Sequence, residues 1–160
     1  MDKDCILVVD DELLIRDLLF EFFTAKGYTV MLAENGRKAI EIVRSDPFDV
    51  ALIDLRMPGI DGMKVIEEIR QVSQEVPIII MTGYPSFNSA IKALRERVYD
   101  YIVKPFQVPH LALVVERAIK EYRLIQQNKE LREDLRRAEQ ELEKLRGDDP
   151  SGLEATTNDQ

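Results

Sequence analysis

Five short apolar runs, each rich in Val, Ile or Leu, alternate with helical patterns along most of the chain. The middle three runs are mostly apolar on both faces, which is typical of a parallel sheet covered by helices on both sides. Strands that alternate with helices also imply right-handed crossovers. The predicted fold class is therefore α/β with a doubly wound parallel sheet, its strands at residues 5–9, 28–33, 48–53, 77–81 and 100–103.

Helical periodicity fills the segments between these runs. The first helix is predicted to end before Gly27, and the next two to begin after Asn35 and Asp61. The first helix is predicted to pack through Leu14, Leu18, Phe22 and Ala25. The helix after Pro85 is predicted to pack through Ile91, Leu94 and Val98.

Polar side chains that can do chemistry stand where these strands end. Asp10 and Asp11 close the first run, Asp54 the third, Thr82 the fourth and Lys104 the fifth. Ligands of open α/β sheets bind at the carboxyl ends of the strands, so these groups are expected to converge. Three carboxylates that meet repel one another unless a cation lies among them, and a hard divalent ion such as Mg²⁺ suits oxygen ligands.

Each of these residues also has an ordinary structural explanation. Asp10 and Asp11 could cap a helix, and Asp54 could begin a turn. Thr82 could be a plain strand-end hydroxyl, and Lys104 a solvated charge. Their joint occurrence at four strand ends favours a binding site for a small anionic group beside a metal.

Over residues 4–122 the chain resembles the receiver domain of two-component response regulators. The matching residues are the pair Asp10-Asp11, Asp54 in IDLRMPGIDG, Thr82 in MTG, and Tyr101 with Lys104 in DYIVKPF. The stretch MTGYPSFNSAIKAL followed by YDYIVKPF looks most like receivers of NtrC-type and DctD-type transcription activators.

The resemblance implies a flavodoxin-like strand order 2-1-3-4-5 and a cis bond at Lys104-Pro105. It implies that Asp54 accepts a phosphoryl group from a sensor histidine kinase, assisted by Lys104 and Thr82, and that Thr82 and Tyr101 form the switch. The implied Mg²⁺ ligands are Asp10, Asp11, Asp54 and the Arg56 carbonyl. Such a domain is a phosphoacceptor switch rather than an enzyme. A phosphatase of the haloacid dehalogenase type would have two aspartates separated by one other residue, whereas Asp10 and Asp11 are direct neighbours.

The last helical segment runs from Pro109 to Arg146 without Gly or Pro. Its beginning should pack on the sheet, whereas its later apolar spacing of alternating four and three residues predicts a coiled coil. Asn128 at an a position favours a parallel homodimer; a single solvated helix is the alternative. The predicted dimer residues are Leu124, Asn128, Leu131, Leu135, Ala138, Leu142 and Leu145.

The predicted organisation is a receiver at 1–122, a coiled-coil extension at 123–146 and a disordered tail at 147–160. The net charge of −8 argues against a direct nucleic-acid surface, and no apolar run is long enough for a membrane span. We therefore expect a cytoplasmic protein. Two further interpretations stay open: the receiver and linker of a longer sigma-54-dependent activator, or a protein-interaction adaptor.

Overall fold

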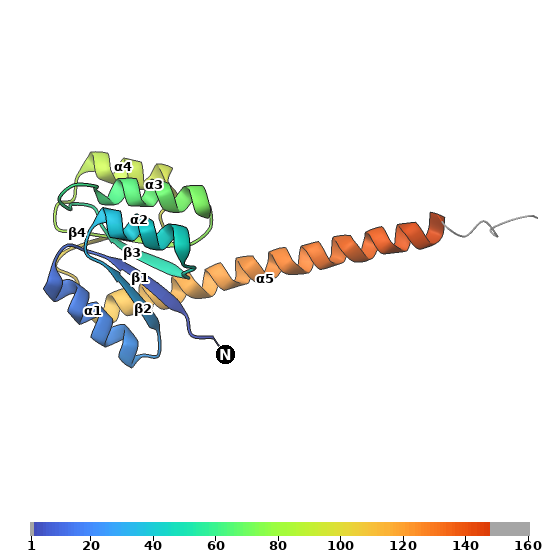
Figure 1. Cartoon of the computed structure of the whole chain (residues 1–160), viewed down its shortest axis with the longest axis horizontal. Helices are drawn as coiled ribbons and strands as arrows, with labels where there is room; N and C mark the ends of the chain where they lie inside the picture. Colours follow the sequence, from blue (N-terminus) through green and yellow to red (C-terminus); the bar gives the residue numbers. More distant parts are fainter. Residues whose placement is uncertain (1, 148–160) are drawn as a thin grey trace, which may run out of the picture. The chain divides into compact units, whose positions relative to one another are not determined.

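The structure is a computed structural model, and it describes residues 2–147. Five parallel strands form one sheet in the order β2-β1-β3-β4-β5, which confirms the predicted fold class and strand order (Figure 1). The strands are β1 (Cys5–Val9), β2 (Thr29–Ala33), β3 (Val50–Asp54), β4 (Ile78–Thr82) and β5 (Asp100–Val103). Compared with the prediction, β3 begins two residues later and β4 one residue later, and each ends one residue later, so that Asp54 and Thr82 are their last residues.

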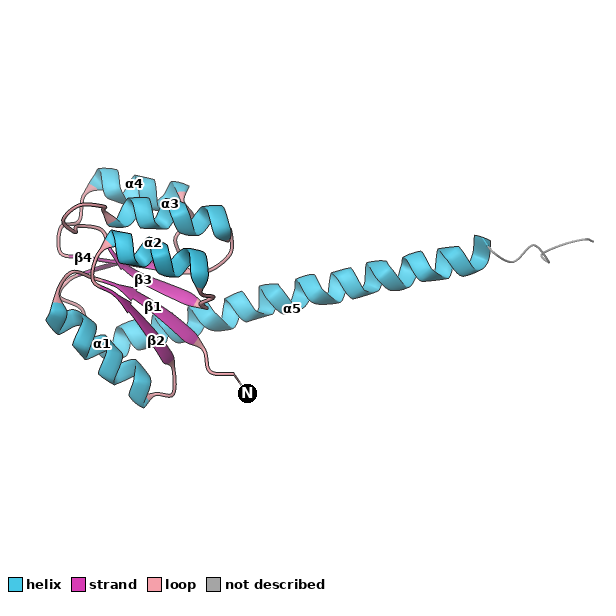
Figure 2. Ribbon diagram, in the orientation of Figure 1, coloured by secondary structure: helices cyan, strands magenta, loops and turns pink. Residues whose placement is uncertain are grey.

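Helices cover both faces of the sheet (Figure 2). They are α1 (Leu13–Ala25), α2 (Gly36–Ser45), α3 (Gly62–Val72), α4 (Phe87–Arg95) and α5 (Val108–Gly147). Neighbouring residues of each strand point to opposite faces. In β3, Ala51 and Ile53 join the core formed with α2, α3 and α4, whereas Val50 and Leu52 join the core formed with α1 and the beginning of α5.

Side-chain caps define where three of the helices begin. Asn35 accepts a hydrogen bond from the amide of Lys38, and Asp61 accepts one from Lys64, so the predicted starts of α2 and α3 are confirmed. Ser86 caps α4 in the same way. Each cap satisfies one amide that the first helical turn leaves without a backbone partner.

The buried faces of α1 and α4 differ in part from the prediction, because Phe22 and Val98 are partly buried against the cores but other predicted positions are exposed. In α1, Leu19 and Phe23 are buried, whereas Leu14 is 82% exposed. In α4, Ala93 is the buried residue and Leu94 is 75% exposed. Both helices carry neighbouring apolar residues, so their sequences allow more than one apolar face, and packing against the sheet selects one of them.

The chain divides into two compact units between Tyr122 and Arg123. The beginning of α5, which was predicted to pack on the sheet, lies in the first unit and is buried at Leu111, Val114, Val115, Ala118 and Ile119. Gly147, which was predicted to start the tail, is the last residue of α5, and the rest of the predicted tail lies outside the described residues. None of the helices in residues 2–147 is both long enough and apolar enough to cross a membrane.

Candidate functional site at the carboxyl edge of the sheet

The predicted strand-end residues meet at one edge of the sheet. Asp10 follows β1 and is fully buried, while Asp54 ends β3 and is 4% exposed. β1 and β3 pair directly, and strand order reverses between them, so these carboxylates lie at the topological switch point where α/β proteins bind ligands. Thr82 is buried at the end of β4.

Lys104 brings a positive charge to the same point. Its ammonium lies 2.7 Å from Asp10 Oδ2, 3.2 Å from Glu12 Oε1 and 3.4 Å from Asp54 Oδ2. The peptide bond between Lys104 and Pro105 is cis, as predicted. One ammonium therefore contacts carboxylates from the β1–α1 segment and from β3.

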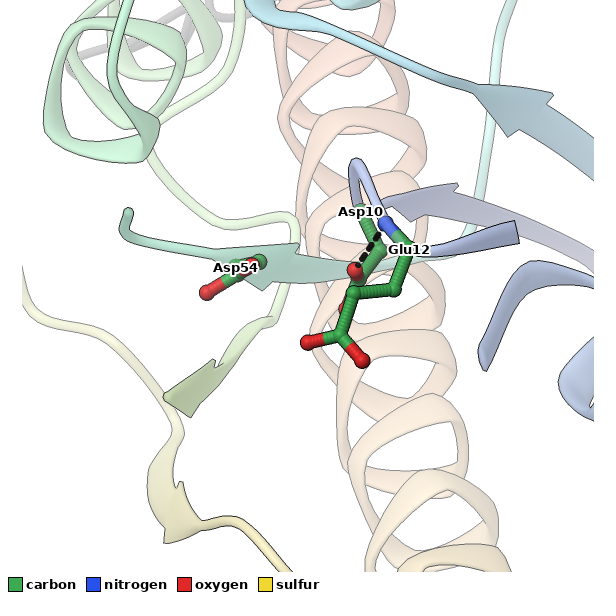
Figure 3. Close-up of side chains that lie close together, drawn as sticks. All are labelled: Asp10, Glu12 and Asp54. Atoms are coloured by element: carbon green, nitrogen blue, oxygen red, sulfur yellow. Dashed lines mark hydrogen bonds between the residues drawn. The ribbon is translucent and has the colours of Figure 1, made fainter. Parts of the chain in front are cut away.

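Three carboxylates form a cluster that could hold a metal ion. Oxygen atoms of Asp10, Glu12 and Asp54 lie within 4.8 Å of one another (Figure 3). Glu12 was not predicted, although it continues the acidic run after the first strand, which is the signal that could have revealed it. Its amide donates to Asp10 Oδ1 at 2.9 Å, the dashed line in Figure 3.

The structure places Asp11, a predicted metal ligand, on the surface beside this cluster. Its side chain is exposed, and it lines a pocket of about 180 Å³ together with Glu12, Asp54, Arg56 and Lys104. It is not one of the three carboxylates that lie within 4.8 Å of one another. The role of Asp11 in metal binding stays a prediction.

Burial and like charge both disfavour ionisation in the cluster. Burial, together with the negative charge of Asp10, raises the pKa of Asp54 to about 6 although Lys104 acts in the opposite direction. Burial also raises the pKa of Asp10. For Lys104, burial works to lower the pKa of the ammonium, but the hydrogen bond and charge of Asp10 outweigh it, so this pKa is raised. The site therefore carries negative charge that an additional cation would stabilise.

A close backbone contact holds Asp54 in place. The amide of Gly62, the first residue of α3, donates to the carbonyl of Leu55 at 2.9 Å. A Cβ atom at Gly62 would overlap the carbonyl group of Asp54. Only glycine therefore lets α3 begin this close to the end of β3.

Two loops border the pocket. The Arg56 amide donates to Asp54 Oδ1 at 3.3 Å, and the Tyr84 amide donates to Thr82 Oγ1 at 3.1 Å. The guanidinium of Arg56 also lies over the Tyr84 ring, 4.5 Å from its centre, so the β3–α3 and β4–α4 loops contact each other beside Asp54. That the Arg56 carbonyl binds a metal stays a prediction.

Tyr101, the predicted switch residue, lies on β5 and is half-buried against the core formed with α2, α3 and α4. Its hydroxyl lies 2.7 Å from Ser89 Oγ on α4. Tyr101 therefore connects the last strand of the sheet to the helix that follows Thr82.

This geometry agrees with the comparison to known families. The model of the response regulator receiver domain matches residues 6–116. The chain belongs to the response regulator receiver domain family. The relatives of this receiver include the regulatory protein AtoC of Escherichia coli K12, which is 40% identical over 72% of this chain and 25% of its own length. The transcriptional regulator NtrC of the same organism is 37% identical over 79% of this chain and 27% of its own. The chain thus spans about a quarter of the length of these curated relatives.

Solved structures resemble the receiver as well. Response regulator protein TrrA of Thermotoga maritima, in complex with Mg(2+)-BeF, has a TM-score of 0.65 and 36% identity, and the match covers 72% of this chain and 98% of that one. NtrX of Brucella abortus has a TM-score of 0.74 and 30% identity, and the match covers 81% of this chain and 30% of that one.

The predicted dimer residues lie on α5 beyond Arg123, in the second compact unit. All are exposed: Leu124, Asn128, Leu131, Leu135, Ala138, Leu142 and Leu145. Ion pairs within the helix join Arg137 to Glu133 and Asp134. The five leucines are more than half exposed, and they recur at the heptad spacing predicted from the sequence.

Proposed function

We propose that this receiver is a phosphorylation-dependent signalling switch whose phosphoacceptor is Asp54. Receiver domains are phosphorylated by sensor histidine kinases. The observation that carries the proposal is the position of Asp54, a buried strand-end carboxylate beside an acidic cluster and 3.4 Å from the Lys104 ammonium. The other aspartate this deeply buried at the edge, Asp10, is held by shorter hydrogen bonds, at 2.7 Å from the same ammonium and 2.9 Å from the Glu12 amide, whereas those of Asp54 are 3.3 and 3.4 Å long.

The transfer needs positioning more than activation of the nucleophile. A carboxylate oxygen of Asp54 attacks the phosphorus of the kinase's phosphohistidine. The new P–O bond forms as the P–N bond breaks, and the departing imidazole keeps the electron pair. Lys104 then stabilises the negative charge on a phosphoryl oxygen.

Magnesium is the cofactor we propose for the acidic cluster. Carboxylate oxygens are the ligands this ion prefers. Burial and the charge of Asp10 raise the pKa of Asp54, so a bound cation would stabilise its ionised form. Asp10 and Asp54 would hold the ion, with Glu12 and Asp11 at the exposed side of the pocket and the Arg56 carbonyl as a further ligand. When bound, the ion neutralises charge on the phosphoryl oxygens. The related TrrA receiver was crystallised with Mg(2+)-BeF.

The switch we propose links Thr82 to Tyr101. The Thr82 hydroxyl accepts a hydrogen bond from the Tyr84 amide, so it must give up this bond if it turns to a phosphoryl oxygen. The loop between Thr82 and α4 then moves, and Tyr101, which lies against α4, repacks. Phosphorylation shifts the population between these two arrangements. The size of the shift is set by the difference in free energy with which the phosphoryl group interacts with each arrangement.

Phosphate labelling tests the phosphoacceptor. Acetyl phosphate with Mg²⁺ should add one phosphoryl group to the wild type, as read by intact mass. Asp54→Asn should remain unlabelled. The control is Asp61→Asn, an exposed helix cap only seven residues away, which should be labelled like the wild type. Undiminished labelling of Asp54→Asn would contradict the assignment of Asp54 as the phosphoacceptor.

The output of the switch is proposed to pass through a homodimer. The exposed leucines at heptad spacing in residues 124–145 would bury their side chains against the same residues of a second chain, with the receiver at 1–122 and the coiled coil at 123–146. Sedimentation at tens of micromolar should show a dimer, and the chain truncated after Tyr122 should be a monomer without phosphorylation. A monomeric full chain would contradict the coiled coil.

A second candidate is favoured by the relatives. AtoC and NtrC are about four times longer than the region that matches this chain, and NtrC is a DNA-binding transcriptional regulator. In this second candidate the sequence corresponds to the receiver and linker of a sigma-54-dependent activator that works in the cytoplasm. Sequencing the gene beyond codon 160 would decide between this and a receiver that acts through protein contacts.

A further inference from the structure

Ser89 joins the cap of α4 to the side chain of Tyr101. The backbone amide of Ser89 donates to Ser86 Oγ at 3.1 Å, and the Ser86 amide donates to Ser89 Oγ at 3.3 Å, so the two serines form a reciprocal capping box. Ser89 Oγ is also 3.0 Å from the Ser86 carbonyl and 2.7 Å from the Tyr101 hydroxyl. One hydroxyl therefore serves both the helix start and the switch residue.

The number of hydroxyl protons decides which residue donates in the hydrogen bond between Ser89 and Tyr101. A serine hydroxyl can donate one hydrogen bond and accept two. The carbonyl of Ser86 can only accept, so the proton of Ser89 is used there. Ser89 Oγ is then an acceptor for its other neighbours, which are the Ser86 amide at 3.3 Å, the Ser86 hydroxyl at 3.0 Å and the Tyr101 hydroxyl at 2.7 Å, the shortest of the three. Tyr101 is the donor in its bond to α4.

The same loop carries Thr82 at its other end. Tyr84, whose amide donates to Thr82 Oγ1, is separated from the cap residue Ser86 by Pro85 alone. A movement of Thr82 that breaks the bond to Tyr84 therefore acts on a loop that reaches the capping box two residues after Tyr84. The bond from Tyr101 to Ser89 belongs to the arrangement in which Thr82 is held by Tyr84.

We infer that Ser89 is a positioning residue of the switch, a latch that holds Tyr101 on α4 in this arrangement and releases it when Thr82 moves. The inference rests on the proposed function, because it assumes that Asp54 is the phosphorylated residue. Breaking a bond made in only one of two arrangements shifts the population toward the other. By linkage, the same shift tightens the binding of any ligand that prefers the other arrangement.

Beryllofluoride, a phosphoryl mimic, is the ligand that tests this with Mg²⁺ present. A hydrogen bond of ordinary net strength corresponds to about a 2- to 10-fold change in an equilibrium constant. Ser89→Ala and Tyr101→Phe should each lower the dissociation constant of beryllofluoride by about this factor, and the double variant should bind no more tightly than either single variant. Ser89→Thr keeps a hydroxyl and should retain the wild-type value.

Ser86→Ala is the matched control, because it removes the cap but leaves both hydroxyl groups of the latch in place. Thermal unfolding should show that Ser86→Ala and Ser89→Ala lose similar stability, whereas only Ser89→Ala changes the affinity. An unchanged affinity in Ser89→Ala, or effects that add in the double variant, would overturn the latch. If the wild type binds no beryllofluoride, the proposed function itself fails and the latch with it.

Discussion

Replacing Asp54 by Asn should stabilise the receiver in the absence of divalent ions. Burial and the charge of Asp10 raise the pKa of Asp54 from 3.8 to about 6, so the fold binds the proton of this carboxyl more tightly than the unfolded chain does. Each pKa unit corresponds to about 1.4 kcal/mol, so ionised Asp54 costs the fold about 3 kcal/mol. Asn has nearly the same shape and can still accept the Arg56 amide through its oxygen.

The sign of the effect determines its pH dependence. Below about pH 4 the carboxyl is protonated in both the folded and the unfolded chain, so it contributes no difference. The stability of the wild type falls as pH rises from about 4 to about 6, and the full cost is present above pH 6. Asp54→Asn should therefore exceed the wild type by about 2 to 3 kcal/mol at pH 7.5 and by almost nothing at pH 4.

Urea unfolding in EDTA across this pH range measures the difference. Asp61→Asn, at an exposed helix cap, controls for the replacement of an aspartate as such. Mg²⁺ should reduce the difference in unfolding free energy between Asp54→Asn and the wild type at pH 7.5. An ion that binds the folded state stabilises it, and the wild type has one more carboxylate with which to bind the ion. A variant less stable than the wild type at pH 7.5, or a gap that does not change with pH, would refute the reasoning.

Three further substitutions probe other parts of the chain. Gly62→Ala should lower the free energy of unfolding by about 1 to 3 kcal/mol and slow labelling of Asp54, because the new Cβ overlaps the backbone there; urea unfolding and labelling rates measure both. Arg70→Leu should cost about 2 to 4 kcal/mol, because the buried guanidinium donates to four backbone carbonyls that would lose this partner. Asn128→Leu should raise the melting temperature and permit larger oligomers, because apolar packing replaces a polar a position; scanning calorimetry and sedimentation would show whether it does.

The strand-end residues could be predicted because two strong patterns locate them. Runs of Val, Ile and Leu mark buried parallel strands, and a polar residue at the end of such a run is expected at the carboxyl edge. Asp10, Asp54, Thr82 and Lys104 follow this rule, and the structure places all four at that edge. Glu12 does not follow it, because it lies three residues beyond the strand, in a segment without periodicity.

The buried face of α1 could not be chosen from the sequence. LLIRDLLFEFF is apolar at most positions, so stripes through Leu14 and Leu18 or through Leu19 and Phe23 have similar hydrophobicity. The sheet and the neighbouring α5 decide between them, and this packing depends on residues far away in the sequence. The bond between Ser89 and Tyr101 was missed for a similar reason, since two hydroxyl groups on separate elements leave no periodic signal.

The stability that Asp54 removes from the fold also explains how a small group can control it. Without a cation the site holds Asp10, Glu12 and Asp54 around one ammonium, and the raised pKa of Asp54 shows that this charge is poorly stabilised. A bound ion offsets that cost, and a phosphoryl group adds oxygens that Lys104 and Thr82 can reach. The hydrogen bond between Tyr101 and Ser89 opposes the rearrangement that the phosphoryl group favours, by the net free energy of about one hydrogen bond. Because a hydrogen bond contributes only about 0.5 to 1.5 kcal/mol, a phosphoryl group that favours the other arrangement by more than this amount changes which arrangement predominates.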